Sequence, residues 1–229
     1  FLPPALAQPH QPILVAAASD LARTRDSLSE SFAKSTRYAA RFTFASTGTL
    51  SRQIEQGAPF DVFLSANEAF VSKLTAAGKL RPDSVRFYAH GRLALWSRSG
   101  GFRRLEDIAR PGVRHIAMAN PSHAPYGAAA QQALSRADLW EKLKAKVVYG
   151  ENVQQALQFA RTGNAEVAIT SWSLVFDGGG VLLPADSHPP IRQAGAVVAG
   201  TRQPEAAAAF LGFLTGPKGR EILRRFGFE

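Results

Sequence analysis

The sequence predicts an α/β protein in which β-strands and α-helices alternate along the chain. Short, continuous apolar runs such as Ile13-Leu14-Val15-Ala16-Ala17 are typical of strands buried on both faces of a sheet. Most of these runs are followed by apolar residues at helical spacing and then by a glycine or proline. Repeated strand–helix units favour mostly parallel sheets with helices on both faces. The 229 residues, 45% of them apolar, suffice for one large domain or two small ones.

The first part of the chain contains three strand–helix units. We expect, in order, strand 13–17, a helix with Leu21, Leu28 and Phe32, strand 41–45, a short helix that starts over Leu50 to Ile54 and ends at Gly57, strand 62–65, and a helix with Phe70, Val71 and Leu74. Gly78 suits the position just after that last helix, where the backbone often turns left-handed.

A second set of units follows. We expect strands at 93–96, 115–119, 146–149 and 167–170, helices over 128–134 and 140–144, and a helix with Ala156, Leu157 and Ala160 that stops near Gly163. Loops are expected at Gly178-Gly179-Gly180 and Pro189-Pro190, and the tail should form two helical pieces, 206–214 and 220–226, broken at Gly216-Pro217. The two sets lack an obvious linker, which favours two lobes with several chain crossings over the alternative of a single sheet.

Small polar residues follow five of these strands at the point where a helix or tight turn begins. The stretches are Ala18-Ser19-Asp20, Ser46-Thr47-Gly48-Thr49, Pro125-Tyr126-Gly127, Glu151-Asn152-Val153 and Thr170-Ser171. In such sheets ligands bind beyond the carboxyl ends of the strands. A helix start also exposes unpaired N–H groups at the positive end of the helix dipole, which attract anions. If these stretches converge, they form a cage for a small oxyanion.

Each stretch taken alone has a simpler interpretation as a helix cap. Ser, Thr, Asp and Asn at an N-cap stabilise a helix by about 1 kcal/mol without any ligand. Asn152, with Gln155 three residues later, fits a capping box. The shared position of the five stretches, rather than any one of them, therefore favours the anion site.

Composition excludes several other functions. The net charge of +9 is spread along the chain with no compact basic stripe, which favours solvated faces and a mild attraction for anions over nucleic-acid binding. The absence of cysteine excludes disulfides and thiolate chemistry, and no apolar run is long enough to span a bilayer. The first residues resemble the end of a secretory signal, with Ala5-Leu6-Ala7 as the cleavage motif, and predict export.

The sequence offers no catalytic constellation. None of the five histidines has a partner histidine four residues away or stands near a carboxylate cluster, and neither a nucleophile elbow nor a phosphate loop occurs. We therefore expect a binding protein without a cofactor rather than an enzyme.

The chain resembles the periplasmic molybdate-binding proteins of ABC importers from Ile13 onward. The most specific match is the run from Phe44 to Ala66, FASTGTLSRQIEQGAPFDVFLSA. Further matches are Val15-Ala16-Ala17-Ala18-Ser19, Ala119-Asn120-Pro121, Ala124-Pro125-Tyr126-Gly127, Glu151-Asn152-Val153-Gln154-Gln155-Ala156-Leu157, and Gly216-Pro217 through Phe226-Gly227-Phe228.

This resemblance implies a two-lobed, type II periplasmic binding fold with the ligand in the cleft. Lobe I is expected to comprise residues 1–88 and 193–229, and lobe II residues 89–192. The ligand implied is molybdate, and tungstate as a close relative of it. The partner implied is the membrane permease of an ABC importer, served by a monomeric periplasmic receptor that does not bind nucleic acid.

The resemblance also implies the binding residues. Ser19 and Thr47 would bind by hydroxyl and backbone N–H, with Ser46 beside Thr47, while Tyr126 and Val153 would bind from the second lobe, Val153 by its backbone N–H alone. All of them would contact oxyanion oxygens, so no residue is expected to coordinate the metal directly.

The chain departs from the family pattern at two places. Many members carry a Tyr where this chain has Ser171 and an Ala where it has Tyr126, so we hypothesise that one tyrosine replaces the other across the cavity and leave Ser171 as a doubtful ligand. Asp20 is the second departure, because a carboxylate repels a dianion. We expect Asp20 to turn away and cap its helix; the alternative is a ligand that carries a proton.

Two other functions stay open. One is a sister receptor for another oxyanion, such as sulfate, phosphate or a chromate-like ion. The other is an anion-sensing domain of a regulator, which would need a helix-turn-helix segment that we do not find before Ile13.

Overall fold

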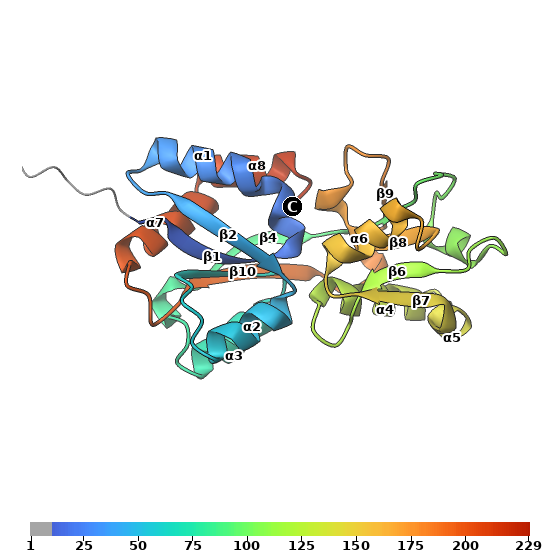
Figure 1. Ribbon diagram of the computed structural model, residues 1–229, viewed down its shortest axis with the longest axis horizontal. Helices are drawn as coiled ribbons and strands as arrows, with labels where there is room; N and C mark the ends of the chain where they lie inside the picture. The colour runs from blue at the N-terminus through green and yellow to red at the C-terminus, as the bar shows by residue number, and fades with distance from the viewer. Residues whose placement is uncertain (1–10) are drawn as a thin grey trace, which may run out of the picture.

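The structure, a computed structural model, describes residues 11–229 and consists of two lobes joined side by side (Figure 1). Each lobe contains a five-stranded sheet, with strand orders β2-β1-β3-β10-β4 and β7-β6-β8-β5-β9. The predicted α/β class and the two-lobed arrangement are confirmed, and the single-sheet alternative is wrong. The cleavage motif at Ala5-Leu6-Ala7 lies outside the described residues.

The sheet of the first lobe combines strands from both ends of the chain. β1 (Ile13–Ala18) pairs in parallel with β2 (Ala40–Ala45) and with β3 (Val62–Ser65). β10 (Ile191–Val197) runs antiparallel between β3 and β4 (Arg86–Gly91). The late strand β10 therefore ties the end of the chain into the first sheet.

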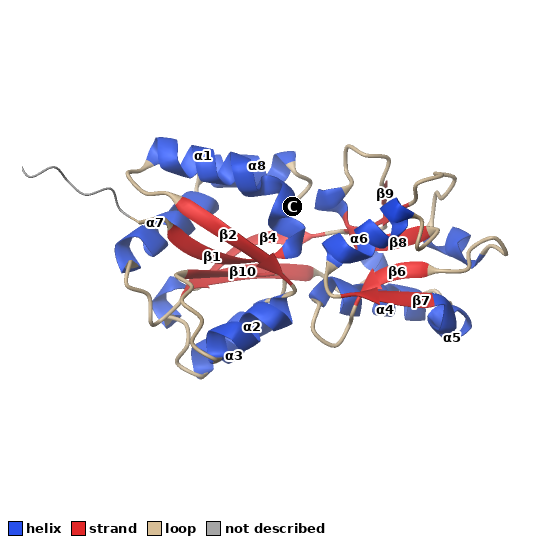
Figure 2. Cartoon of the chain, viewed as in Figure 1, coloured by secondary structure: helices blue, strands red, loops and turns tan. Residues whose placement is uncertain are grey.

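Helices cover both faces of this sheet (Figure 2). α1 (Arg25–Ser35), α7 (Pro204–Thr215) and α8 (Pro217–Arg225) pack on one face, and α2 (Thr47–Glu55) and α3 (Glu68–Ala76) on the other. Val15 and Ala17 of β1 belong to the first of these two cores, whereas Ala16 belongs to the second. Alternate side chains of one strand thus serve opposite faces, which explains why the strand is apolar throughout.

The second lobe repeats this plan. β6 (Ile116–Ala119) is parallel to β7 (Val147–Gly150) and β8 (Val167–Ser171), while β5 (Leu93–Trp96) is antiparallel to β8 and to β9 (Val181–Leu182). Its helices are α4 (Pro125–Arg136), α5 (Trp140–Leu143) and α6 (Val153–Thr162). Short 3-10 turns complete the molecule: η1 (Ser19–Thr24), η2 (Pro82–Ser84), η3 (Leu105–Ala109), η4 (Lys144–Lys146), η5 (Trp172–Leu174) and η6 (Ala185–Ser187).

Three strands were missing from the sequence prediction: β4, β9 and β10. Of these, β4 and β10 lie where the chain passes between the lobes. β4 ends at Gly91, directly before β5 of the second sheet, and β10 begins at Ile191 after the chain has left that sheet. Each sheet consequently holds one strand, β10 or β5, that runs against the other four.

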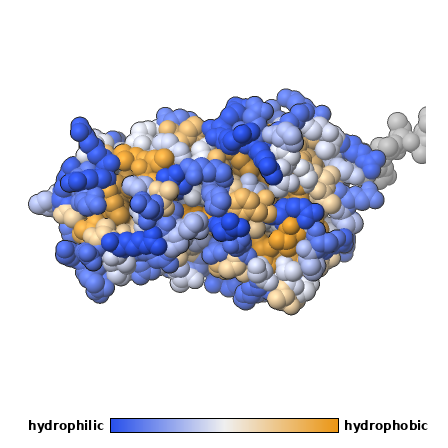
Figure 3. All heavy atoms as spheres, turned by 180° about the vertical axis from the view of Figure 1, so that it is seen from behind, coloured by the Kyte–Doolittle hydropathy of each residue, from blue (hydrophilic) through white to orange (hydrophobic). Residues whose placement is uncertain are grey.

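The surface matches the scattered charge of the sequence. On the face seen in Figure 3, hydrophilic side chains cover much of both lobes and separate several hydrophobic patches. Within residues 11–229, no helix has both the length and the apolar character needed to cross a bilayer.

Candidate anion site between the lobes

A small cavity lies between the two lobes, at the ends of their strands. Its volume is about 10 Å³, far below the size of a typical drug-like pocket. The lining residues are Ala18, Ser19, Asp20, Ala45, Ser46, Thr47 and Ala66 from the first lobe, and Ala124, Pro125, Tyr126, Asn152 and Val153 from the second. Two residues of this lining have ionisable side chains, the acid Asp20 and the phenol Tyr126, and none is basic.

Six of the seven residues singled out from the sequence line this cavity. Ser171 is the exception: its side chain is buried, and its Oγ lies 2.6 Å from Oγ of Ser173.

Helix α2 leaves one N–H group of its first turn available at the cavity. The helix begins at Thr47, with Ser46 as its N-cap. The N–H of Gly48 donates to the carbonyl of His123 (2.9 Å), and that of Thr49 donates to Oγ of Ser46 (3.3 Å). The N–H of Thr47, at the first helical position, has no partner within the helix.

Helix α6 shows the same arrangement. Oδ1 of Asn152 accepts hydrogen bonds from the N–H groups of Gln154 (2.9 Å) and Gln155 (3.1 Å). The N–H of Val153, at the first helical position, is therefore left over. The capping box predicted here forms only in part, because the side chain of Gln155 accepts from the N–H of Glu151 (2.6 Å) rather than from that of Asn152.

Helix α4 contributes the N–H group of Tyr126, the residue after its initial proline, to the cavity. Pro125 occupies the first helical position, where its fixed φ suits the helix and its missing N–H costs nothing. The first N–H group of this helix consequently belongs to Tyr126, which lines the cavity. Helices from both lobes thus begin at one small space, each with a first-turn N–H that has no hydrogen-bond partner among the described residues.

The hydroxyl groups of the site differ in how far they are committed elsewhere. Oγ1 of Thr47 accepts from the N–H of Ala66 (3.1 Å), which leaves its own hydrogen available to a ligand. Ser19 lines the cavity at the start of η1. Oγ of Ser46, by contrast, lies within hydrogen-bond distance of three side-chain groups, in addition to the N–H of Thr49.

Asp20 faces into the protein rather than away from it. Its side chain is buried, and its Oδ2 accepts hydrogen bonds from Oη of Tyr126 (2.9 Å) and Nε2 of Gln193 (2.6 Å). The N-cap of its helix, Ala18, receives no side-chain hydrogen bond. Two partners distant in sequence thus hold its carboxylate at the junction of the lobes, and the expectation that Asp20 turns away from the ligand stays a prediction.

Burial dominates the electrostatics of this group. Desolvation raises the pKa of Asp20 from 3.8 to about 6, even though the hydrogen bonds from Gln193 and Tyr126 and the backbone N–H groups of Asp20 and Leu21 act to lower it. Burial, together with the negative charge of Asp20, raises the pKa of the Tyr126 phenol well above its ordinary value. Tyr126 therefore stays a neutral donor.

Gly91 makes room for Tyr126. A Cβ atom at position 91 would lie 2.1 Å from Oη of Tyr126. The phenol donates to Asp20 and accepts from Nε2 of Gln193 (3.1 Å), so its hydrogen is committed in this arrangement. The proposed exchange of tyrosines stays a hypothesis.

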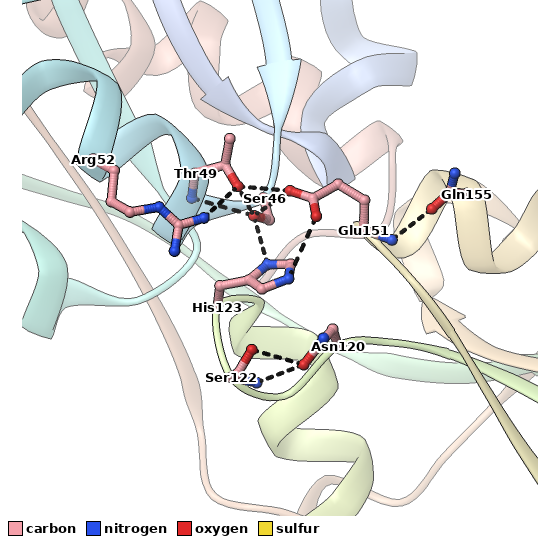
Figure 4. Close-up of polar contacts among 8 residues, drawn as sticks. All are labelled: Ser46, Thr49, Arg52, Asn120, Ser122, His123, Glu151 and Gln155. Atoms are coloured by element: carbon pink, nitrogen blue, oxygen red, sulfur yellow. Dashed lines mark hydrogen bonds and ion pairs between the residues drawn. The ribbon is translucent and has the colours of Figure 1, made fainter. Parts of the chain in front are cut away.

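A second polar cluster, drawn in Figure 4, joins the two lobes through Ser46, Thr49, His123 and Glu151, and we call it the latch. Oγ of Ser46 lies 2.9 Å from Nδ1 of His123, and Nε2 of His123 lies 3.4 Å from Oε2 of Glu151. Oγ1 of Thr49 donates to Oε1 of Glu151 (2.6 Å). These bonds connect α2 of the first lobe with two loops of the second, so the lobes are closed on each other.

The latch brings one histidine beside a single carboxylate, a contact that the sequence did not predict. His123 and Glu151 are 28 positions apart in the sequence, and only the fold brings them together. The trio of serine, histidine and acid resembles a hydrolytic triad in composition, but its imidazole is reversed: the serine meets Nδ1 and the acid meets Nε2.

Three comparisons place the chain among known proteins. The family model of bacterial extracellular solute-binding proteins matches residues 13–229. The molybdate-binding protein ModA of Azotobacter vinelandii is 35% identical over 226 residues, covering 94% of this chain and 89% of that protein. The solved structure of the periplasmic molybdate-binding protein of Azotobacter vinelandii matches with a TM-score of 0.91 at 32% identity, covering 95% of this chain and 98% of that one.

A more distant structure shares the fold alone. The sulfate-binding protein SubI from Mycobacterium tuberculosis matches with a TM-score of 0.77 at 18% identity, covering 96% of this chain and 86% of its own. On the strength of the family model and the 35% identical relative, this chain belongs to the bacterial extracellular solute-binding proteins.

Proposed function

We propose that this protein is a receptor that binds molybdate between its lobes and delivers it to the membrane permease of an ABC importer. The observation that carries the proposal is the cavity at which three helices present uncommitted first-turn N–H groups, those of Thr47, Tyr126 and Val153. The family and the molybdate-binding relatives support the same assignment. No catalytic step and no cofactor is part of the proposal.

Neutral donors suit a fully ionised oxyanion. Molybdate has oxygens that only accept hydrogen bonds, and the partial positive charge at each helix start favours an anion without a lysine or arginine in the lining. Closure of the lobes removes water, and each N–H dipole then interacts with the ion more strongly than it would in solvent. Selection among tetrahedral ions would rest on the size of the cavity, and tungstate, the close relative of molybdate, should bind as well.

We expect Ser19, Thr47, Tyr126 and Val153 to contact the oxygens, with Ser46 beside them in the latch. The moving units would be lobe I, residues 1–88 and 193–229, and lobe II, residues 89–192. The protein would act as a monomer in the periplasm.

A panel of oxyanions tests the function. The full chain is titrated calorimetrically with molybdate, tungstate, sulfate, phosphate and chromate, and its melting temperature is recorded with each. A specific ligand at 100 times its Kd should stabilise the protein by about 2.7 kcal/mol. Molybdate and tungstate should shift the melting temperature while sulfate does not.

The panel also tests the alternatives. Tight binding of sulfate or phosphate without molybdate would make the protein a sister receptor for that ion. One observation favours phosphate. Near neutral pH this ion keeps a P–OH group, and the carboxylate of Asp20, which lines the cavity, could accept a hydrogen bond from it.

A further inference from the structure

The one acid of the cavity is held at a point where parts from both lobes meet. Asp20 belongs to η1 of the first lobe, Tyr126 to α4 of the second, and Gln193 to β10, which enters the first sheet after the chain returns. The hydroxyl of Ser173 in η5 donates to the backbone carbonyl of Asp20 (2.7 Å). These contacts fix the carboxyl group in the closed arrangement of the lobes.

The two oxygens of this carboxyl group have different surroundings. Oδ2 receives two hydrogen bonds, from Tyr126 and from Gln193. Oδ1 is buried and has no hydrogen-bond partner among residues 11–229, although the side chain of Asp20 is only 1% exposed. A buried carboxylate oxygen without a partner is costly, and Asp20 lines the anion cavity.

Among residues 11–229, no cation acts on this acid. The titratable groups that interact with it are the phenols of Tyr126 on α4 and Tyr88 on β4, and burial raises the pKa of both phenols well above the ordinary value. The nearest arginine on the same helix, Arg23, is engaged by Asp177, with its Nη2 2.6 Å from Oδ2. Gln193 and Ser173 on the remaining elements are neutral.

A dianion next to an ionised carboxylate would repel it in a space without compensating charge. Burial already raises the pKa of Asp20 to about 6, and an anion bound beside it acts in the same direction. A proton cannot easily join Oδ2, since that oxygen is occupied by two donors, whereas Oδ1 is free to carry one. Once protonated, Oδ1 changes from an acceptor into a donor.

From this geometry we infer that Asp20 enters the complex as a neutral acid, with its proton on Oδ1 donated to an oxygen of the bound oxyanion. The receptor would then take up one proton with each ion, and Asp20 would be an additional binding and specificity residue. This inference rests on the proposed function, because it requires an oxyanion in the cavity.

Calorimetry measures the proton directly. The full chain is titrated with sodium molybdate at pH 7.5 in buffers of different ionisation enthalpy, and the dependence of the heat on the buffer gives the number of protons taken up. We expect about one proton per molybdate and a Kd that rises by up to about tenfold per pH unit between pH 6.5 and 8.5.

The variant Asp20→Asn is the matched control. Its amide keeps the size of the acid and a donor group but does not titrate. We expect it to bind molybdate without proton uptake, with a Kd that is constant over this range and lower than that of the unaltered protein at pH 8.5. His123→Gln, which removes the imidazole of the latch, should retain the proton uptake whatever its Kd.

The outcomes distinguish failure of the role proposed for Asp20 from failure of the receptor function. Binding of molybdate without proton uptake by the unaltered protein overturns the role of Asp20 and leaves the receptor function standing. A pH dependence that persists in Asp20→Asn also overturns it. Absence of heat with molybdate at every pH, in both proteins, overturns the receptor function and the inference together.

Discussion

The backbone N–H of Val153 can be deleted on its own, because proline is tolerated at the first position of a helix. Three helices of this chain, α4, α7 and α8, already begin with proline. Asn152, which precedes Val153, has an extended backbone (φ −153°, ψ 179°) of the kind that a following proline requires. Val153→Pro should therefore leave α6 intact while it removes one proposed donor to the oxyanion.

The size of the effect follows from the contacts of α6. The two cap bonds to Asn152 come from Gln154 and Gln155 and are unaffected by a proline at 153. The loss is thus one hydrogen bond to a charged acceptor, worth about 1.5–3 kcal/mol. Since about 1.4 kcal/mol is a factor of ten, the Kd for molybdate should rise by about 10- to 150-fold.

The control is Val153→Ala, which shortens the same buried side chain and keeps the N–H. Calorimetric titration of molybdate into the two variants isolates the contribution of the N–H group, and their melting temperatures without ligand report on the helix. Equal affinities of the proline and alanine variants, within a factor of two, would refute the assignment of Val153 as a backbone ligand.

Three further perturbations test closure, the buried phenol and the pH dependence of stability. In Gly48→Ala, the new Cβ would lie 2.7 Å from the carbonyl oxygen of His123 in the other lobe, so we expect full closure to cost about 1–3 kcal/mol and the Kd to rise accordingly. The control Gly212→Ala, whose Cβ would have nothing within 4 Å, should bind normally. Equal binding by both variants would contradict a closed complex of this geometry. Tyr126→Phe removes a hydroxyl that donates to Asp20. If that hydrogen turns to the oxyanion in the complex, as the exchange of tyrosines requires, calorimetry should show binding weakened by about 1–3 kcal/mol, and an unchanged Kd would dismiss the exchange. Burial lowers the pKa of His188, so the unfolded chain binds a proton more readily below its ordinary pKa of 6.5, and the stability that is complete above that value should be lost as the pH falls through it. The drop in melting temperature between pH 7.5 and 5 should be smaller in His188→Asn, and a drop of the same size would exclude this histidine as the cause.

Most of the fold was predictable because it rests on local patterns. The strand 13–17 is apolar at every position since both faces of β1 are covered, and the helix that ends at Gly78 has the left-handed glycine (φ +69°) that its sequence indicated. β4 and β10 were not predicted. Arg86 and His90 interrupt the apolar pattern of β4, and β10 pairs only with strands that lie far away in the sequence. Local periodicity carries no information about such pairing.

The residues of the site likewise fall into those that local sequence patterns indicate and those that only the fold brings together. The stretches that contain Ser19, Thr47, Tyr126 and Val153 could be singled out because each lies where a helix or turn begins after a strand, and that signal is contained in a few neighbouring residues. The choice of these four residues within the stretches came from the resemblance to the family. His123, Glu151 and Gln193 gave no such signal. Gln193 stands in an otherwise mostly apolar segment, and a polar residue that is fully buried within a strand was the one available hint of a partner elsewhere.

Asp20 shows why a local interpretation can fail at a functional site. An acid in the first turn of a helix is ordinarily a favourable charge at the positive end of the dipole. Its orientation here is decided by Tyr126 and Gln193, which lie 106 and 173 positions away. The same helix starts that attract an oxyanion also attract this carboxylate, so the acid and the ligand compete for one positive potential. A proton on Asp20 removes the competition and turns the acid into a donor, and the affinity of the receptor would then depend on pH through a residue that its sequence neighbourhood assigns to capping.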